Sequence, residues 1–159
     1  DVGGQDTKII TVVKGQVSDF LMNDKCSAGT GKFLEVMANR LGVGILELFE
    51  LGEKGDPLSI SSMCTVFAES EVISYIGQGK KREDVAAGVI QSVVNKVKQL
   101  GQRHGIKYPC ILTGGLSVTP HFAQKLETAL GVPVSNLELG RYAGALGAAL
   151  ISAERKGAS

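Results

Sequence analysis

The sequence predicts an α/β fold in which helices flank a mixed β-sheet. Three observations support this prediction: two β-branched segments lie close together near the amino end, helical patterns fill the middle of the chain, and strands and helices alternate in its last third. The two early strands are joined by a tight turn and are expected to pair with each other, whereas a helix separates the two later strands. A sheet that combines both kinds of connection is mixed rather than purely parallel.

The amino-terminal segment predicts a β-hairpin. Residues 8–13 (Lys-Ile-Ile-Thr-Val-Val) are rich in β-branched side chains, residues 14–16 form a turn, and residues 17–22 form the second strand. The sequence starts directly on the turn at Gly3 and Gly4, where a strand would normally lead in. We therefore expect it to be a fragment of a longer protein.

Helical spacing dominates the middle of the chain. From Gly31 apolar residues recur at helical intervals as far as Leu41, and Gly42 marks the expected end of that helix. A longer amphipathic helix is expected at 83–104, with one apolar stripe formed by Val85, Val89, Val93, Val97 and Leu100. The other expected elements are helices at 45–51, 65–76 and 120–130, strands at 109–113 and 132–134, and a last helix rich in Ala and Gly at 141–155.

The composition restricts the class of protein. A chain of 159 residues suffices for about one domain, and 17 Lys and Arg against 16 Asp and Glu leave a formal net charge of +1. This balance gives no basis for nucleic-acid binding, and no apolar run approaches the roughly 20 residues of a membrane span. Three cysteines do not form a disulfide framework, so a reducing, cytoplasmic setting is expected.

The first candidate site is the segment Asp1-Val2-Gly3-Gly4-Gln5-Asp6. Two glycines after an acidic residue allow backbone N–H groups to approach a phosphate closely. The carboxylates of Asp1 and Asp6 could hold Mg²⁺ or its waters, and Gln5 could orient an attacking water. A hairpin turn with acidic decoration is the simpler alternative, because Gly-Gly turns are common.

A second Gly-Gly turn follows a predicted strand in Thr113-Gly114-Gly115-Leu116-Ser117. Strand ends of this kind are where α/β folds place ligands. A tight strand-to-helix connection explains the motif as well, but two such turns in one chain strengthen each other. The Gly-Thr-Gly-Lys piece at 29–32 is not a P-loop, since that motif needs Gly where Cys26 stands and Ser or Thr where Phe33 stands.

Two of the three cysteines precede predicted helix starts. Cys26 stands before the helix that begins at Gly31, and Cys64 stands before the helix that begins at Thr65. Helix N-termini stabilise negative charge, which suits a thiolate that binds a metal or an iron–sulfur centre. One chain cannot complete a four-cysteine site, but two copies related by a two-fold axis could. Two buried or capping cysteines remain the alternative, and Cys110 is expected to be a small core residue.

Four further polar residues receive simpler interpretations. His104 and His121 are isolated, without the spacing of metal ligands, and are expected at surface or capping positions. Lys32 and Glu35 lie close to the expected nucleotide cleft, but an ion pair on a helix surface explains them equally well.

These motifs together resemble a known superfamily and, within it, one family. Segment 1–6 resembles the second phosphate motif of the actin, hexokinase and heat-shock-chaperone ATPases, residues 113–120 resemble their adenosine motif, and residues 141–148 their final small-residue helix. More specific are residues 23–35 (Asn-Asp-Lys-Cys-Ser-Ala-Gly-Thr-Gly-Lys-Phe-Leu-Glu) and 64–73 (Cys-Thr-Val-Phe-Ala-Glu-Ser-Glu-Val-Ile). Both resemble the activator (component A) of 2-hydroxyacyl-CoA dehydratases, a family that also holds the ATPase subunits of benzoyl-CoA reductase.

The resemblance implies a ribonuclease-H-like (actin-like ATPase) domain with a mixed sheet flanked by helices. Residues 1–159 would form its second half, with cluster-binding segments at 23–35 and 59–76 and with the first phosphate-motif domain absent. Half of the nucleotide cleft would then be missing, so ATP turnover by this chain alone is not expected. The final helix would be partly uncovered.

The resemblance also implies cofactors and site residues. One 4Fe-4S cluster would bridge a homodimer, with Cys26 and Cys64 as ligands from each chain. ATP or ADP with Mg²⁺ would be the second cofactor. Its expected binding residues are Gly3, Gly4, Gly114, Gly115, Lys32 and Glu35, and its expected catalytic residues are Asp1, Gln5 and Asp6.

The activity implied by the resemblance is ATP-driven electron transfer. Nucleotide binding and hydrolysis would change the angle between the cysteine-bearing helices on a partner dehydratase or benzoyl-CoA reductase-type component. A donor such as ferredoxin or flavodoxin would supply the electron. No nucleic acid and no membrane are expected as partners.

Two other classes of protein stay open. A sugar-kinase-like or chaperone-like nucleotide-binding half-domain would carry structural cysteines and no iron. A dimeric zinc or redox-sensing module would use the same two cysteines without ATP, and the identity of its metal would distinguish it.

Overall fold

A computed structural model describes residues 1–157 of the chain. The helices are α1 (Gly31–Leu41), α2 (Ile45–Gly52), α3 (Thr65–Gly77), α4 (Arg82–His104), α5 (Pro120–Leu130) and α6 (Ala143–Gly157). The strands are β1 (Thr7–Val13), β2 (Gln16–Asn23), β3 (Cys110–Leu112) and β4 (Val134–Asn136), and two short 3-10 helices are η1 (Gly115–Val118) and η2 (Gly140–Tyr142). Every predicted helix and strand is present, and none of their ends is displaced by more than two residues.

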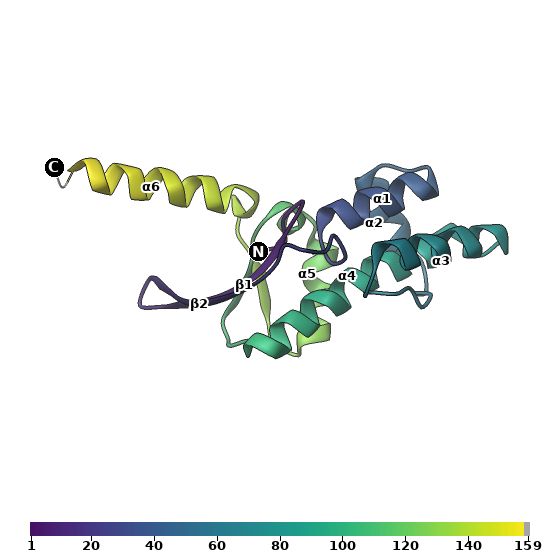
Figure 1. The fold of residues 1–159 in the computed structure, drawn as a ribbon, viewed down its shortest axis with the longest axis horizontal. Helices are drawn as coiled ribbons and strands as arrows, with labels where there is room; N and C mark the ends of the chain where they lie inside the picture. Colours follow the sequence, from purple (N-terminus) through teal and green to yellow (C-terminus); the bar gives the residue numbers. More distant parts are fainter. Residues whose placement is uncertain (158–159) are drawn as a thin grey trace.

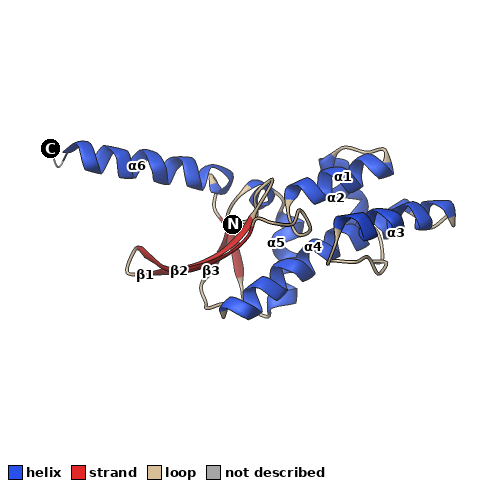
Figure 2. Ribbon diagram, in the orientation of Figure 1, coloured by secondary structure: helices blue, strands red, loops and turns tan. Residues whose placement is uncertain are grey.

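The strands form one antiparallel pair and one parallel pair (Figure 2). β1 pairs antiparallel with β2 from Thr7 opposite Asn23 to Val13 opposite Gln16, and β3 pairs parallel with β4. The two residues between β1 and β2, Lys14 and Gly15, both have positive φ, which gives the hairpin the twist that its strands require. Both kinds of pairing expected for a mixed sheet are thus present, in two small sheets.

Helix α4 forms the centre of the molecule. All five residues of its predicted apolar stripe are buried, and so are Ala86, Ala87 and Ile90 on other sides of the helix. α1, α2, α3, α5 and the hairpin pack around it, so α4 is apolar on most of its circumference. At Gly88 the polypeptide preceding α3 approaches so closely that a Cβ atom would lie 2.4 Å from the Leu58 carbonyl oxygen.

Three parts of the molecule expose large apolar side chains. α6 projects away from the rest of the chain, and the tip of the β1–β2 hairpin projects on the same side of the molecule (Figure 1). α1, α2 and α3 lie at the other end, and α3 also carries exposed apolar residues. These exposed side chains include Val12, Val17 and Phe20 on the hairpin, Val66, Phe67 and Ile73 on α3, and Leu146, Leu150 and Ile151 on α6.

Candidate functional site

The two Gly-Gly segments predicted from the sequence lie against each other. The Val2 N–H donates to the Thr113 carbonyl oxygen at 2.9 Å, and the Leu116 N–H donates to the Val2 carbonyl oxygen at 3.3 Å. Gly114 has φ of +88°, and a Cβ atom there would lie 2.5 Å from the Val2 carbonyl oxygen. Only glycine therefore allows this approach between the two backbones.

The acidic residues of the first motif gather around one lysine. Asp1 accepts a hydrogen bond from the Thr113 hydroxyl at 2.8 Å. The Lys8 ammonium lies 2.6 Å from an Asp6 carboxylate oxygen and 3.9 Å from one of Asp1, whereas Gln5 is exposed. A cation bound between these carboxylates would compete with the Lys8 ammonium. The sequence predicts Lys8 only as a strand residue, so its contact with the two carboxylates is found only in the structure.

The start of α1 is bonded to the same Gly-Gly turn. The Gly31 N–H donates to the Gly3 carbonyl at 2.9 Å, and the Lys32 N–H donates to the Gly4 carbonyl at 2.7 Å. Two amides that a helix N-terminus leaves unpaired are thereby satisfied by the turn. Lys32 and Glu35 form an exposed ion pair with a Nζ–Oε2 distance of 3.1 Å. The structure thus places Lys32 at the Gly3–Gly4 turn.

The two cysteine-bearing segments also contact each other. The hydroxyl oxygens of Ser27 and Thr65 are 2.8 Å apart and share a hydrogen bond, and the Cys26 Sγ lies 3.8 Å from the Met63 carbonyl oxygen. Cys26 and Cys64 are both free thiols and partly exposed. Residues that immediately follow each cysteine in the sequence therefore hold the two segments together.

The cysteines differ in their relation to the helices. Cys64 is the N-cap residue of α3, as the sequence predicts. The N-cap residue of α1 is Thr30, so Cys26 lies in the preceding loop, four residues before the cap. The unpaired amides of the first turn of α3 therefore follow directly after Cys64, whereas those of α1 follow directly after Thr30.

The loop that carries Cys26 is fixed by hydrogen bonds on both sides. The Asn23 side-chain amide donates to the carbonyl oxygens of Cys26 and Ala28, each at 3.0 Å. The Thr30 hydroxyl donates to the Ser27 carbonyl at 2.7 Å. The sequence analysis predicts no separate role for Asn23 and Thr30, although both lie within the cysteine-bearing segment 23–35.

The segment before Cys64 is held from α3. A Glu71 carboxylate oxygen accepts a hydrogen bond from the Ser61 N–H at 2.6 Å, and the Tyr75 hydroxyl donates to the Ser59 carbonyl at 2.9 Å. Both side chains reach back along α3 over the segment that leads into it. Only the folded structure brings these partners together, because more than one helical turn separates Glu71 from Cys64.

Both histidines lie at helix ends but are more buried than expected, whereas the third cysteine is less buried than expected. The side chain of His104 is only 5% exposed, and its Nε2 lies 2.8 Å from the Thr11 hydroxyl oxygen. His121 is largely buried as well, so neither histidine is a surface residue. Cys110 is half-buried rather than part of the core, and burial raises the pKa of its thiol.

No three His, Cys, Asp or Glu side chains among residues 1–157 are grouped as metal ligands. No helix in the described part of the chain is long and apolar enough to cross a bilayer. What the structure assembles is a glycine-rich pair of turns with nearby carboxylates, and beside α1 a pair of cysteine-bearing loops.

Comparison with known proteins gives the family. Residues 1–152 match the BadF/BadG/BcrA/BcrD ATPase family, and the chain belongs to it. The (R)-2-hydroxyglutaryl-CoA dehydratase activating ATPase of Acidaminococcus fermentans is 49% identical over 151 residues, which are 94% of this chain and 58% of the relative. The 2-hydroxyisocaproyl-CoA dehydratase activator of Clostridioides difficile is 42% identical over 94% of this chain and 57% of the relative. The chain thus spans less than two thirds of the relatives it matches.

Solved structures agree with this assignment and confirm the predicted fold class. The crystal structure of the Acidaminococcus fermentans dehydratase component A matches with a TM-score of 0.89 and 48% identity, over 94% of this chain and 58% of that one. The 2-hydroxyisocaproyl-CoA dehydratase activator from Clostridium difficile with bound ADPNP also has a TM-score of 0.89, at 39% identity, over 94% of this chain and 57% of that one. The expectation that the sequence resembles a dehydratase activator is therefore confirmed.

Proposed function

We propose that residues 1–159 form the second half of an ATP-dependent electron-transfer activator of a 2-hydroxyacyl-CoA dehydratase or a related acyl-CoA reductase. The observation that carries the proposal is the contact between the two cysteine-bearing loops, made by the Ser27–Thr65 hydrogen bond. It joins the two loops that carry free, partly exposed thiols, in a chain from an ATPase family. A nucleotide-binding domain with purely structural cysteines would not need that arrangement.

The donor set fits an iron–sulfur cluster shared by two chains. Cys26 and Cys64 supply two thiolates, half of the set that binds a 4Fe-4S cluster, and a two-fold partner would supply the other half. When bound, such a cluster supplies one-electron transfer at low potential. Exposed apolar side chains of Met63, Val66 and Phe67 flank Cys64 and would be covered in the homodimer.

The glycine turns support nucleotide binding by the same chain. Gly3, Gly4, Gly114 and Gly115 would allow the phosphates and the adenosine to approach the backbone, with Lys32 and Glu35 at the edge of the cleft. Asp1 and Asp6 would hold Mg²⁺ in place of Lys8, and Gln5 would orient the attacking water. The relative with bound ADPNP supports nucleotide binding, and the roles of these residues are part of the proposal.

Hydrogen bonds join the two proposed sites through α1. The Gly3 and Gly4 carbonyls accept from the first amides of α1, and Thr30, at the same helix end, holds the Cys26 loop through Ser27. A nucleotide that moved the Gly3–Gly4 turn would therefore move the start of α1 and the Cys26 loop together. This connection is our proposed route by which nucleotide state alters the helices that carry the cysteines.

The test is the iron and acid-labile sulfide content of the chain purified and reconstituted without oxygen. About two irons and two sulfides per chain are expected, which corresponds to one four-iron cluster per dimer. Cys26→Ser and Cys64→Ser should each abolish binding, whereas Cys110→Ser, the matched control, should retain it because Cys110 lies on β3, away from both loops.

Each other outcome points to a different protein. Zinc in place of iron would favour the dimeric metal or redox-sensing module. A well-folded chain without iron would contradict cluster binding by these residues and favour the kinase-like or chaperone-like half-domain.

In the activator that we propose, the electron donor would be a ferredoxin or flavodoxin, and the setting would be the cytoplasm.

A further inference from the structure

The Cys26 loop, residues 26–29, has a side-chain donor for every one of its backbone carbonyl groups. Asn23 and Thr30, which flank the loop in the sequence, supply all but one of these hydrogen bonds. The remaining bond comes from a distant residue, because the Thr7 hydroxyl donates to the Gly29 carbonyl at 2.7 Å. The local bonds give the loop its shape, whereas the bond from Thr7 fixes its position relative to β1.

The Thr7 hydroxyl and its acceptor are both shielded from water. Thr7 is 0% exposed, and Gly29 is buried as well. Gly29 has φ of +89°, and a Cβ atom there would lie 2.4 Å from the Cγ of Lys96 on α4. The stem of Lys96 therefore covers the loop at the residue that Thr7 holds. If the buried carbonyl lost its donor, water could not replace it without movement of the loop.

Thr7 is also joined to the acidic segment 1–6. It follows Asp6 directly, forms a β-bridge with Val2, and lies opposite Asn23 in the β1–β2 pair. Asn23 itself donates two hydrogen bonds to the Cys26 loop. The cross-strand pair of Thr7 and Asn23 therefore connects that loop to the end of the acidic segment.

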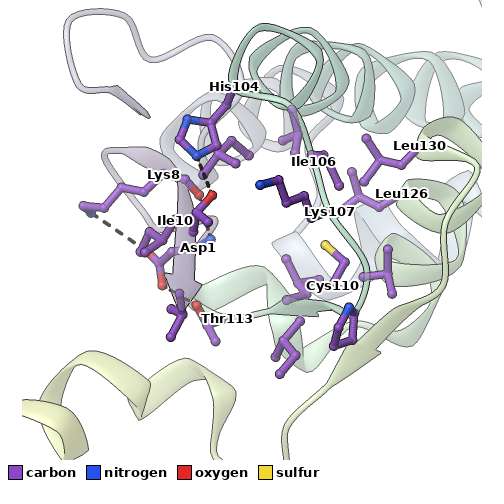
Figure 3. Close-up of a pocket in the computed structure, with 18 of the residues that line it drawn as sticks. Asp1, Lys8, Ile10, His104, Ile106, Lys107, Cys110, Thr113, Leu126 and Leu130 are labelled. Atoms are coloured by element: carbon purple, nitrogen blue, oxygen red, sulfur yellow. Dashed lines mark hydrogen bonds and ion pairs between the residues drawn. The ribbon is translucent and has the colours of Figure 1, made fainter. Parts of the chain in front are cut away.

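The next residue of β1 contacts the carboxylates of the acidic segment. The Lys8 ammonium lies 2.6 Å from an Asp6 oxygen and 3.9 Å from an Asp1 oxygen, and a dashed line in Figure 3 joins Lys8 to Asp1. Successive side chains of a strand point to opposite faces. Thr7 and Lys8 thus extend from the start of one strand to the Cys26 loop on one face and to the proposed cation site on the other.

We propose that Thr7 is a positioning residue that links the cation site between Asp1 and Asp6 to the Cys26 loop. This inference rests on the proposed function, in which Mg²⁺ with nucleotide takes the place of the Lys8 ammonium. Release of Lys8 would let the start of β1 shift, and the hydrogen bond of Thr7 would move the Cys26 loop with it. The link is separate from the route through α1, because it does not pass through the Gly3–Gly4 turn.

Three variants separate the hydroxyl of Thr7 from its packing. Thr7→Val keeps the shape of the side chain and removes the donor, whereas Thr7→Ser keeps the donor and removes a methyl group. Ser92→Ala is the matched control, because Ser92 is 2% exposed and its hydroxyl donates at 2.8 Å to Val89 within α4 rather than to the loop. Circular dichroism checks the helix content of each variant, and Thr7→Ala replaces Thr7→Val if valine prevents folding.

The first readout needs neither iron nor nucleotide. It is the exchange rate of the buried Thr30 amide, which donates to the Ser27 carbonyl at 3.0 Å inside the loop. Thr7→Val should speed this exchange by about tenfold, because the Gly29 carbonyl loses its donor and the loop opens more often. Thr7→Ser and Ser92→Ala should stay within about twofold of the parent chain.

The second readout is the response of the loop to nucleotide. The alkylation rate of Cys26, followed by peptide mass in the iron-free chain, is measured with and without ADPNP and Mg²⁺. Calorimetric titration of each variant sets a saturating concentration. ADPNP should change the rate by about threefold or more in the parent chain and in Thr7→Ser, and by less than about 1.5-fold in Thr7→Val.

Four results would overturn the proposal. They are unchanged Thr30 exchange in Thr7→Val, the same acceleration in Thr7→Ser or Ser92→Ala, a parent chain that binds ADPNP without a change at Cys26, and a response to ADPNP that persists in Thr7→Val. The last result would assign the connection between the two sites to α1.

Failure of the link and failure of the proposed function give different results. A parent chain that binds no ADPNP in the titration would overturn the link together with the proposed nucleotide site. A parent chain that binds ADPNP normally, combined with any of the four results above, would overturn the link alone.

Discussion

At the scale of single residues, His121 makes the stability of this protein depend on pH. Its side chain is 17% exposed, its Nε2 is buried without a hydrogen-bond partner among the described residues, and its Nδ1 lies 3.8 Å from Glu53. Burial lowers the pKa of this imidazole, Lys125 lowers it further, and Glu53 opposes the shift. The fold therefore favours the neutral imidazole.

The lowered pKa of His121 makes the folded chain less stable in acid than at neutral pH. Because the pKa is lower in the folded chain than the usual 6.5 of histidine, this contribution to stability is present above pH 6.5 and is lost as the pH falls through the lower, folded value. The free energy of unfolding, measured with urea between pH 7.5 and 5, should therefore decrease toward acid. His121→Leu should flatten that part of the profile, and an unchanged profile in this variant would refute the assignment.

The buried histidines also show what sequence patterns at this scale could not reveal. The sequence predicts surface or capping positions for both, because both are isolated and lack the spacing of metal ligands. The residues that determine their setting are Thr11, 93 positions away from His104, and Glu53, the residue that follows α2. In contrast, the apolar stripe of α4 was predictable, since residues three and four apart share one face of a helix.

At the scale of elements, the two glycine turns carry the prediction for nucleotide binding. Neither Gly4 nor Gly115 has a positive φ, and a Cβ atom at either position would meet no atom within 4 Å. The fold does not need glycine there, so the double variant Gly4→Ala, Gly115→Ala should remain as stable as the parent chain. If the turns bind phosphate and adenosine through close backbone approach, it should bind ADPNP with Mg²⁺ about tenfold more weakly, a change of about 1.4 kcal/mol.

Calorimetric titration with ADPNP measures this effect. Gly44→Ala is the matched control, because a Cβ atom there also meets nothing within 4 Å and Gly44 lies before α2, away from both turns. Equal affinity in the double variant and the control would remove these turns from the site. Failure of the parent chain to bind ADPNP would contradict nucleotide binding by this half of the protein.

Local periodicity explains why the elements themselves were predictable. For example, α5 begins at Pro120 and is followed by Gly131 as its C-cap residue. Its bounds in the structure are the predicted ones. The helix caps were less predictable: the sequence shows that Cys26 precedes the helix that begins at Gly31, but not that Thr30 is its N-cap residue. The 3-10 helices and the division of the strands into two sheets depend on contacts between distant segments, which no local pattern encodes.

At the scale of the whole molecule, the exposed apolar side chains on α3 predict how two copies assemble. Phe67 is 64% exposed, one helical turn after the cysteine that we propose as a cluster ligand, and Val66 and Met63 extend the same apolar surface. Covering a phenylalanine contributes about 1.5–3 kcal/mol, and a two-fold interface would contain the residue twice. Phe67→Glu should therefore weaken the reconstituted dimer by more than about tenfold and lower its iron content, although both cysteines remain.

Sedimentation velocity of the anaerobically reconstituted protein, combined with iron analysis, measures both effects. Phe20→Glu is the matched control: Phe20 is 58% exposed on β2, and Figure 1 shows the hairpin at the opposite end of the molecule from α3. If the α3 surface is the interface, only Phe67→Glu shifts the protein to monomer, and dimer and iron are lost together because each chain supplies half of the ligands. A Phe20→Glu variant that dissociates while Phe67→Glu stays dimeric would move the interface to the hairpin. Cys26 and Cys64 would then lie outside the interface, which would contradict a cluster shared between two chains.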